Sequence, residues 1–170
     1  MNSKPQAGEY APYYSKYISL VPEGNILEIL AEQITAAEKL FREITEEKSK
    51  FRYSEGKWSI REVLGHIIDT ERIFAYRALR FSRNDKTALP GFEQDDFVPN
   101  SNQDNVLLKD LLEELLLVRK ANLKMFASFS DEMWTRVGIA SENAMSVRAL
   151  AYNLAGHLTH HISVIKEKYL

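Results

Sequence analysis

The stretch SEGKWSIREVLGHIIDTERIFAYRALRFSRND, residues 54–85, decides the fold of this chain. Ser59 is followed three residues later by Glu62, the capping-box pattern that starts a helix. Apolar side chains then recur at helical spacing as far as about Phe81, at Ile60, Val63, Leu64, Ile67, Ile68, Ile73 and Phe74. The pattern predicts a long amphipathic helix and places His66 about two turns inside it, among apolar neighbours.

Three further segments have the same helical periodicity. They cover residues 25–44, 107–126 and 146–170, and Ser146 is a suitable N-cap for the last of them. The segments between them show no convincing alternation of the kind that marks a β-strand. Four long amphipathic helices without strands predict an all-α protein, a four-helix bundle that forms a single domain of residues 1–170.

The segments that join the predicted helices differ in length. Residues 1–24, rich in Pro, Tyr and Gly, predict an irregular N-terminal arm whose tyrosines lie over the bundle surface. Residues 84–104 form a loop between the second and third helices that is longer than a simple helix connection. This loop leaves both an up-down-up-down and a crossover topology open, and it is long enough to act as a lid. Residues 130–143 predict a connection with a short turn around Met133 and Trp134.

Composition and charge exclude some classes of binding partner, namely nucleic acids and membranes. The 170 residues are 45% hydrophobic and carry a formal net charge of -2, from 22 basic and 24 acidic residues. Nearly balanced charge lacks the long-range attraction that a phosphate-tracking protein needs, so we expect no nucleic-acid partner. No run approaches the roughly 20 apolar residues of a membrane span. The start of the chain also lacks the apolar core of a signal peptide, so we expect no membrane partner and a cytoplasmic location.

The four histidines of the chain fall into two groups, His66 alone and a cluster of His157, His160 and His161. On a helix, residues 157 and 161 present their rings on one face about a turn apart, a spacing that lets two imidazoles bind one metal ion. Bundle cores build metal sites from side chains on facing helices, so His66 can complete the set. Because the chain has no cysteine, thiolate ligands are excluded. We therefore predict a divalent metal site at His66, His157 and His161.

Two alternatives to this ligand set stay open. His157 and His160, at i and i+3, are a rival pair, although His160 points about 100° away from His161 around a helix and is expected behind the ligands or at the surface. The histidines can also be polar core residues that are hydrogen-bonded without any metal.

Three neutral imidazoles and no carboxylate leave a metal ion its full charge and at least one position for water. Such an open arrangement is typical of catalytic sites, because structural zinc sites normally take four protein ligands. Asp69 lies one turn after His66, and Asn153 lies one turn before His157. Both are candidates for orienting ligands or substrate, with a solvated helix face as the simpler explanation of each.

Four segments together resemble the DinB-like (DinB/YfiT) proteins. They are KWSIREVLGHIIDTERIFAYRALRFSRND (57–85), LPGFEQDDFV (89–98), ELLLVRKANLKMF (114–126) and SVRALAYNLAGHLTHHISVIKEKYL (146–170). The most specific elements are the histidine that follows the WS start of one helix and the HxxHH run in the last helix. The resemblance covers nearly the whole chain and implies a four-helix bundle, commonly a homodimer. It also implies a divalent metal, often nickel or zinc, whose ligands fall on His66, His157 and His161.

The resemblance also limits the expected reactions. Members of the wider superfamily include thiol-dependent transferases and isomerases that use bacillithiol, mycothiol or glutathione. We therefore expect a metal-dependent enzyme that acts on a small-molecule substrate and activates either a low-molecular-weight thiol, as an S-transferase, or water, as a hydrolase. The alternative is a non-catalytic, metal-binding or stress-associated scaffold bundle in which the metal is structural.

Overall fold

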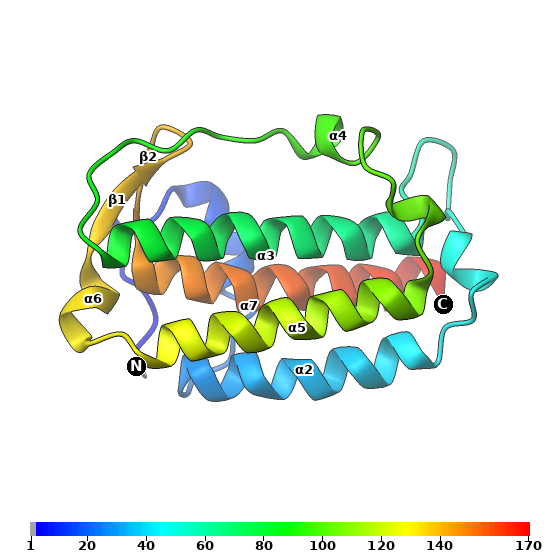
Figure 1. Ribbon diagram of the computed structural model, residues 1–170, viewed down its shortest axis with the longest axis horizontal. Coiled ribbons are helices and arrows are strands. Elements are labelled where there is room, and N and C mark those ends of the chain that lie inside the picture. Colours follow the sequence, from blue (N-terminus) through cyan, green and yellow to red (C-terminus); the bar gives the residue numbers. More distant parts are fainter. Residues whose placement is uncertain (1–2) are drawn as a thin grey trace.

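The computed structural model describes residues 3–170 and contains the predicted four-helix bundle (Figure 1). Its long helices are α2 (Ile26–Arg42), α3 (Ile60–Ser82), α5 (Leu108–Ala127) and α7 (Val147–Val164). The capping box at the start of α3 is confirmed, because the Ser59 hydroxyl accepts from the Glu62 backbone N–H and the Glu62 carboxylate accepts from the Ser59 N–H. No helix within residues 3–170 is both long enough and apolar enough to cross a membrane.

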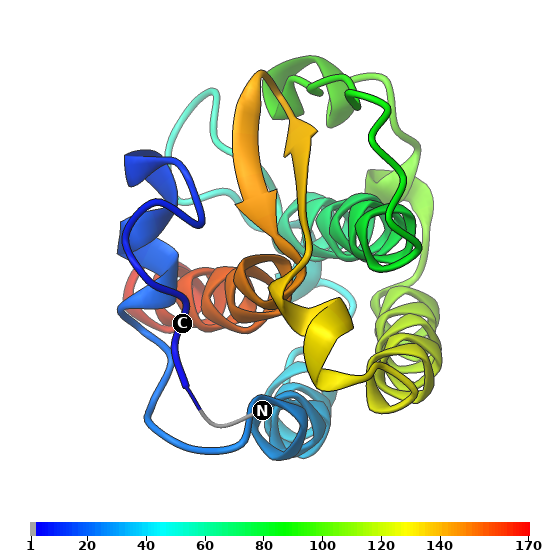
Figure 2. The ribbon, with the colours of Figure 1, turned by 90° about the vertical axis from the view of Figure 1, so that its left-hand side faces the viewer.

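The bundle has the crossover topology. Helices α2 and α7 run in one direction and α3 and α5 in the other (Figure 1). Both α2 and α3 pack against α5 and α7, so α2 and α3 lie diagonally across the bundle (Figure 2). Because α3 and α5 are parallel neighbours, the chain must return along the whole bundle between them. That return explains the long loop of residues 83–107, which we call the crossover loop. It carries the short helices α4 (Gln94–Phe97) and η3 (Gln103–Asn105).

The expectation of a bundle without strands is wrong. Strands β1 (Val137–Ala140) and β2 (Asn143–Ser146) form an antiparallel hairpin beside one end of the bundle, after the short helix α6 (Asp131–Thr135). Each strand has four residues, too few for a clear alternating pattern. The two turn residues, Ser141 and Glu142, have positive φ angles of 51° and 65°. This is the backbone that a tight two-residue hairpin turn requires.

The N-terminal arm is more ordered than predicted. It contains a 3₁₀ turn, η1 (Pro12–Tyr14), and one turn of helix, α1 (Ser15–Ile18), which packs against α7. Tyr17 is buried there, which corrects the prediction that the tyrosines of an irregular arm only cover the surface. At the other terminus, α7 does not continue to the end, because a π-helical turn, η4 (Ile165–Tyr169), follows it. A further 3₁₀ turn, η2 (Lys48–Lys50), precedes α3.

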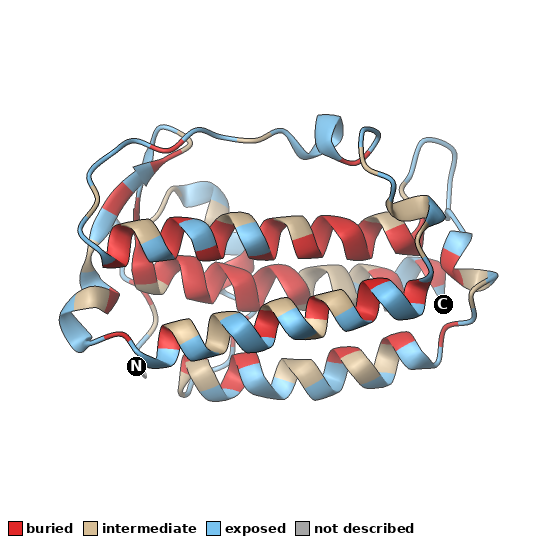
Figure 3. Ribbon diagram, viewed as in Figure 1, coloured by how far each residue is buried: buried red, intermediate tan, exposed pale blue. Residues whose placement is uncertain are grey.

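The core consists of two apolar clusters separated by a polar belt. One cluster lies near the hairpin and includes Phe81, Trp134 and Leu150. The other lies near the opposite end and includes Leu64 and Leu111. Between them, each long helix contributes inward polar side chains, which we call the polar belt: Gln33, Thr70, Glu71, Arg119 and His157. Figure 3 shows that α3 and α7 are the most continuously buried helices, and the predicted metal ligands lie on these two.

Candidate metal centre

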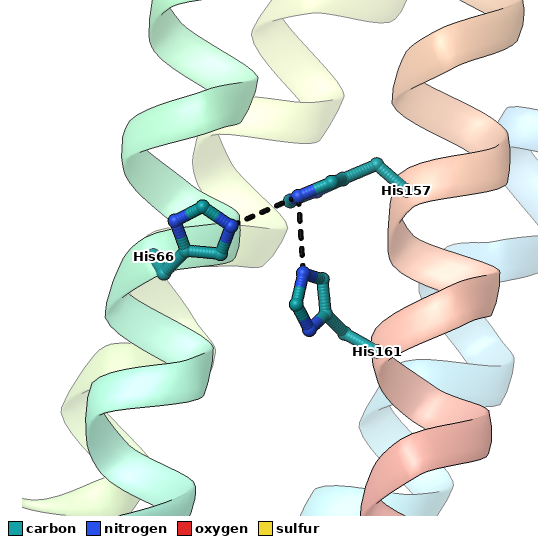
Figure 4. Close-up of side chains that lie close together, drawn as sticks. All are labelled: His66, His157 and His161. Carbon is teal, nitrogen blue, oxygen red and sulfur yellow. Dashed lines mark hydrogen bonds between the residues drawn. The ribbon is translucent and has the colours of Figure 1, made fainter. Parts of the chain in front are cut away.

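The three predicted ligands converge between α3 and α7 (Figure 4). His66 projects from the second turn of α3, and His157 and His161 project from successive turns of α7. The two helices pack antiparallel along their length, so a residue near the start of α3 faces residues in the second half of α7. The i, i+4 spacing on α7 places both of its rings on the face that α3 covers.

The interatomic distances fit a shared ion. His157 Nε2 lies 3.0 Å from His66 Nε2 and 3.1 Å from His161 Nε2. Two nitrogens at roughly 2.0–2.1 Å from a zinc ion in tetrahedral geometry lie about 3.3 Å apart. A neutral imidazole nitrogen carries either one proton or one lone pair, so His157 Nε2 can serve only one of its two contacts as a hydrogen bond. Convergence of three Nε2 atoms is therefore better explained by a common ligand than by a hydrogen-bonded core.

Burial keeps the three rings neutral, which is the form that binds metals. Desolvation lowers the pKa of His66 to about 4 and that of His161 to about 3. The pKa of His157 is held well below its ordinary value, first by desolvation and then by the neighbouring histidines. Protons therefore compete weakly for this site at neutral pH.

These lowered pKa values predict how the metal-free protein responds to acid. An unfolded histidine binds a proton below about pH 6.5, whereas folded His66 and His161 stay neutral until about pH 4 and about pH 3. Between these limits the unfolded state binds more protons, so the free energy of unfolding should fall as the pH falls. The decline is up to roughly 1.4 kcal/mol per pH unit for each such histidine.

Urea unfolding of the metal-free protein between pH 7.5 and pH 4.5 measures this decline. His161→Gln should reduce the slope of this decline by close to the contribution of one histidine. His160→Gln should reduce the slope less, because the ring of His160 is less desolvated than that of His161. If stability fell equally steeply with pH in His161→Gln and in the parent protein, His161 would not be a buried, neutral histidine.

The other candidate residues lie apart from the convergent rings. His160 is half-buried, and its ring packs against Tyr17 and His161 instead of joining the ligand set. Asp69 accepts a long hydrogen bond, 3.4 Å, from Gln103 in the crossover loop. Asn153 is buried and donates to the Ala149 carbonyl. No hydrogen bond joins Asp69 or Asn153 to a histidine within residues 3–170, and their orienting roles stay predictions.

Two cavities reach the histidines from different sides. The first cavity, about 360 Å³, contacts His66 and His157 and is lined by Tyr13, Tyr14, Tyr17, Thr70, Phe74, Phe92, Glu93, Gln94, Asp95 and Ser141. The second cavity, about 330 Å³, contacts His160 and His161, and Trp58 forms part of its wall. Asp95 of α4 lines both cavities. The crossover loop thus forms part of the walls around the site, and its action as a lid stays a prediction.

Several lining residues were not predicted from the sequence. Tyr17 packs its ring 5.5 Å from the ring of His157, and Trp58 lies 5.0 Å from that of His66. Thr70 was detectable in principle, because it lies four residues after His66 and hence on the same helical face. The positions of Tyr17 and Ser141 at the cavity wall depend on how the N-terminal arm and the hairpin pack against the bundle. The periodicity of the sequence does not reveal this packing.

Comparisons with solved structures agree with this fold. YfiT from Bacillus subtilis, described as a probable metal-dependent hydrolase with an unusual four-helix bundle topology, matches with a TM-score of 0.72 at 16% identity, over 98% of this chain and 91% of its own. A mycothiol-dependent maleylpyruvate isomerase matches with a TM-score of 0.64 at 9% identity. That match covers 81% of this chain but only 58% of the isomerase. Such low identities show a shared fold alone.

Sequence comparisons place the chain in a family. No curated protein sequence matches it significantly. The model of the DinB superfamily, however, matches residues 29–165, which include the four long helices from the first turn of α2 onward and all three convergent histidines. The chain therefore belongs to the DinB superfamily.

Proposed function

We propose that this protein is a metal-dependent enzyme with a divalent ion, nickel or zinc, bound by His66, His157 and His161. In this proposal a low-molecular-weight thiol or a water molecule is activated for attack on a small-molecule electrophile. The observation that carries the proposal is the convergence of three neutral imidazole nitrogens, within 4.8 Å of one another, at the edge of open cavities.

The residues present fit such an ion. Imidazole is a common ligand of both zinc and nickel, and its neutral form is secured here by burial. A divalent ion in this position would lower the pKa of a bound water or thiol, which is the chemistry the proposal needs. The protein's own contribution is to hold the imidazoles in place and to restrict bulk water. Tyr17 and Trp58 pack against the rings and serve both purposes.

Two observations favour an enzyme over a scaffold with a structural metal. Within residues 3–170 the ligand group comprises three histidines and no fourth side chain, whereas structural zinc sites are closed by four. The first cavity, moreover, has the size of a small-molecule site. The description of YfiT as a probable metal-dependent hydrolase supports the water branch, and the mycothiol-dependent isomerase supports the thiol branch.

Elemental analysis of protein purified without an affinity tag or chelator tests the site. We expect near-stoichiometric nickel or zinc in the parent protein and little in His161→Ala, with His160→Ala as the matched control that keeps its metal. Loss of a test electrophile should then depend on the metal, and its dependence on added thiol separates transfer from hydrolysis. Absence of metal from the parent protein, even after reconstitution, would overturn the proposal. Stoichiometric metal without turnover of any electrophile would favour the scaffold.

A further inference from the structure

Arg77 is a buried cation without an acidic partner. Three arginines are buried in the described chain, and two of them pair with carboxylates, Arg61 with Glu46 and Arg119 with Glu71. No carboxylate within residues 3–170 forms an ion pair with Arg77, although only 2% of this residue is exposed. Burying an unpaired charge is costly, and burial accordingly lowers the pKa of Arg77. A cation retained under these conditions indicates a place for an anion that the chain itself does not supply.

The neighbours of Arg77 fix its guanidinium behind the first cavity. Its Nη2 donates to the Pro90 carbonyl at 2.9 Å and to the Ser141 hydroxyl at 3.0 Å. The Tyr14 hydroxyl lies near the guanidinium, which counteracts part of the rise that burial causes in the pKa of Tyr14. The rings of Phe74 and Phe92 lie 5.5 and 5.9 Å from its central carbon. Arg77 itself lines a separate cavity of about 390 Å³, together with Pro90. Its other neighbours line the first cavity, which also contacts His66 and His157, so they stand between the guanidinium and that cavity.

This arrangement leaves a hydroxyl proton free for donation at the cavity wall. A hydroxyl that accepts a hydrogen bond from a guanidinium keeps its own proton for donation elsewhere. Ser141 is therefore a donor available at the cavity wall, and the Tyr14 hydroxyl group belongs to a residue that lines the same cavity. Thr70 adds a third hydroxyl: it is 2% exposed, it lines the same cavity, and its Oγ1 has no hydrogen-bond partner in the described residues. A buried hydroxyl without a partner is unfavourable unless a ligand completes it.

We propose that Thr70, Tyr14 and Ser141, backed by Arg77, form a subsite for the carboxylate of an elongated substrate whose other end reaches the metal centre. This inference rests on the proposed function. Along α3, Thr70 lies about 6 Å and Arg77 about 16 Å beyond His66, at 1.5 Å per residue. A ligand that spans the cavity therefore separates its carboxylate from its metal-binding group by several bonds.

The charges at the rim of the cavity are consistent with this orientation. Glu93 and Asp95 also line the first cavity, but both are exposed and their fields are weakened by solvent and salt. They disfavour a carboxylate at the rim and leave the wall in front of Arg77 as the favourable place for one. The cavity volume of about 360 Å³ suits a small molecule.

Thiols of graded length test the subsite in cobalt(II)-loaded protein. The probes are 3-mercaptopropionate, 6-mercaptohexanoate and 8-mercaptooctanoate, each compared with the mercapto-alcohol of the same length. Thiolate-to-cobalt absorption bands report the dissociation constants. The two longer acids should bind roughly tenfold more tightly than their alcohols, the size expected of charge-assisted hydrogen bonds, while the three-carbon pair should bind equally.

Variants show whether the preference for acids over alcohols comes from the residues of the proposed subsite. Thr70→Val and Tyr14→Phe should each reduce the acid preference severalfold without weakening the alcohols, and Arg77→Met should abolish it. If Arg77→Met does not fold, the two hydroxyl variants decide the question. Tyr76→Phe is the matched control, because it makes the same change as Tyr14→Phe, at an exposed residue of α3 that does not line the first cavity. It should leave every dissociation constant unchanged.

The outcomes separate the subsite from the metal centre. If cobalt binds but acids and alcohols bind equally at every length, or no thiol binds at all, the subsite is refuted and the metal site stands. If elemental analysis finds no cobalt, the metal centre fails, and the subsite proposal fails with it. If Thr70→Val and Tyr14→Phe leave the preference for acids over alcohols unchanged, the proposed carboxylate subsite is also refuted.

Discussion

Replacing Glu71 by alanine is expected to lower the free energy of unfolding by about 3–5 kcal/mol, the usual cost of leaving one half of a buried ion pair. Glu71 is 2% exposed and accepts hydrogen bonds from Arg119 Nε and Nη2 at 2.8 and 2.9 Å. Asn122 donates to the same carboxylate at 3.0 Å. Without Glu71, the guanidinium of Arg119 would remain buried in the polar belt as an uncompensated charge. Urea unfolding followed by far-ultraviolet circular dichroism measures the loss.

Two comparisons show whether the uncompensated charge is the cause. The double variant Glu71→Met with Arg119→Met removes both charges and should lose much less stability than Glu71→Ala alone. Glu38→Ala breaks an exposed pair with Arg42 on α2 and should cost less than about 1 kcal/mol. If Glu71→Ala cost no more than Glu38→Ala, the buried pair would not have the stabilising role that its geometry indicates.

The polar belt also explains why the core is not one continuous cluster. Arg119 Nη1 donates to the side-chain oxygen of Gln33 at 2.8 Å, and Gln33 Nε2 donates to the carbonyl of Ala155 at 2.8 Å. These bonds link α5, α2 and α7 at one level of the bundle, and Glu71 adds α3. A shift of one helix along its axis would leave several of these groups unpaired, so the belt favours a single register.

The helices and the histidine set were predictable because both depend on local spacing. The 3.6-residue period persists over 17 to 23 residues in the helices α2 and α3, long enough to dominate the pattern. The spacing of the histidine pair on α7 is likewise a property of one helix. Bringing His66 to that pair needed only the assumption that a bundle core gathers histidines from facing helices. That assumption is met by the antiparallel contact of α3 with α7.

The features that sequence did not predict depend on packing between distant segments. Periodicity shows which face of a helix is apolar but not which helices are neighbours, so the crossover topology stayed open. The strands of the β1–β2 hairpin are too short to show a clear alternation of apolar and polar residues. Tertiary contacts hold the hairpin in place, such as the hydrogen bond from the Leu89 N–H to the Ile139 carbonyl. The same holds for the position of Ser141 at the cavity wall. The metal's identity and the expected homodimer stay predictions.

Gly156→Ala is expected to detach the N-terminal arm from α7 and to lower the free energy of unfolding by about 3 kcal/mol, at the upper end of overpacking costs. A Cβ at Gly156 would lie 2.0 Å from the Tyr17 carbonyl oxygen and 2.4 Å from its carbon. Both are backbone atoms, so no change of rotamer relieves the overlap and α1 itself must move. Urea unfolding measures the loss of stability, and faster tryptic cleavage after Lys16 reports release of the arm.

Gly65→Ala on α3 is the matched control. Both substitutions gain about 1 kcal/mol of helix propensity. The new Cβ at Gly65 would meet side-chain atoms of Gln103 and no backbone atom. Rotation of Gln103 relieves the contacts with its Cγ and Cδ, at 2.2 and 2.5 Å, while its Cβ, at 2.9 Å, must shift by a few tenths of an ångström with its loop. Gly65→Ala should therefore cost less, and equal stability of the two variants would contradict a backbone clash. Because Tyr17 packs on His157 and lines the first cavity, release of the arm should also open that cavity to solvent. The small residue at position 156 thus couples the order of a segment outside the bundle to the environment of the proposed metal ligands.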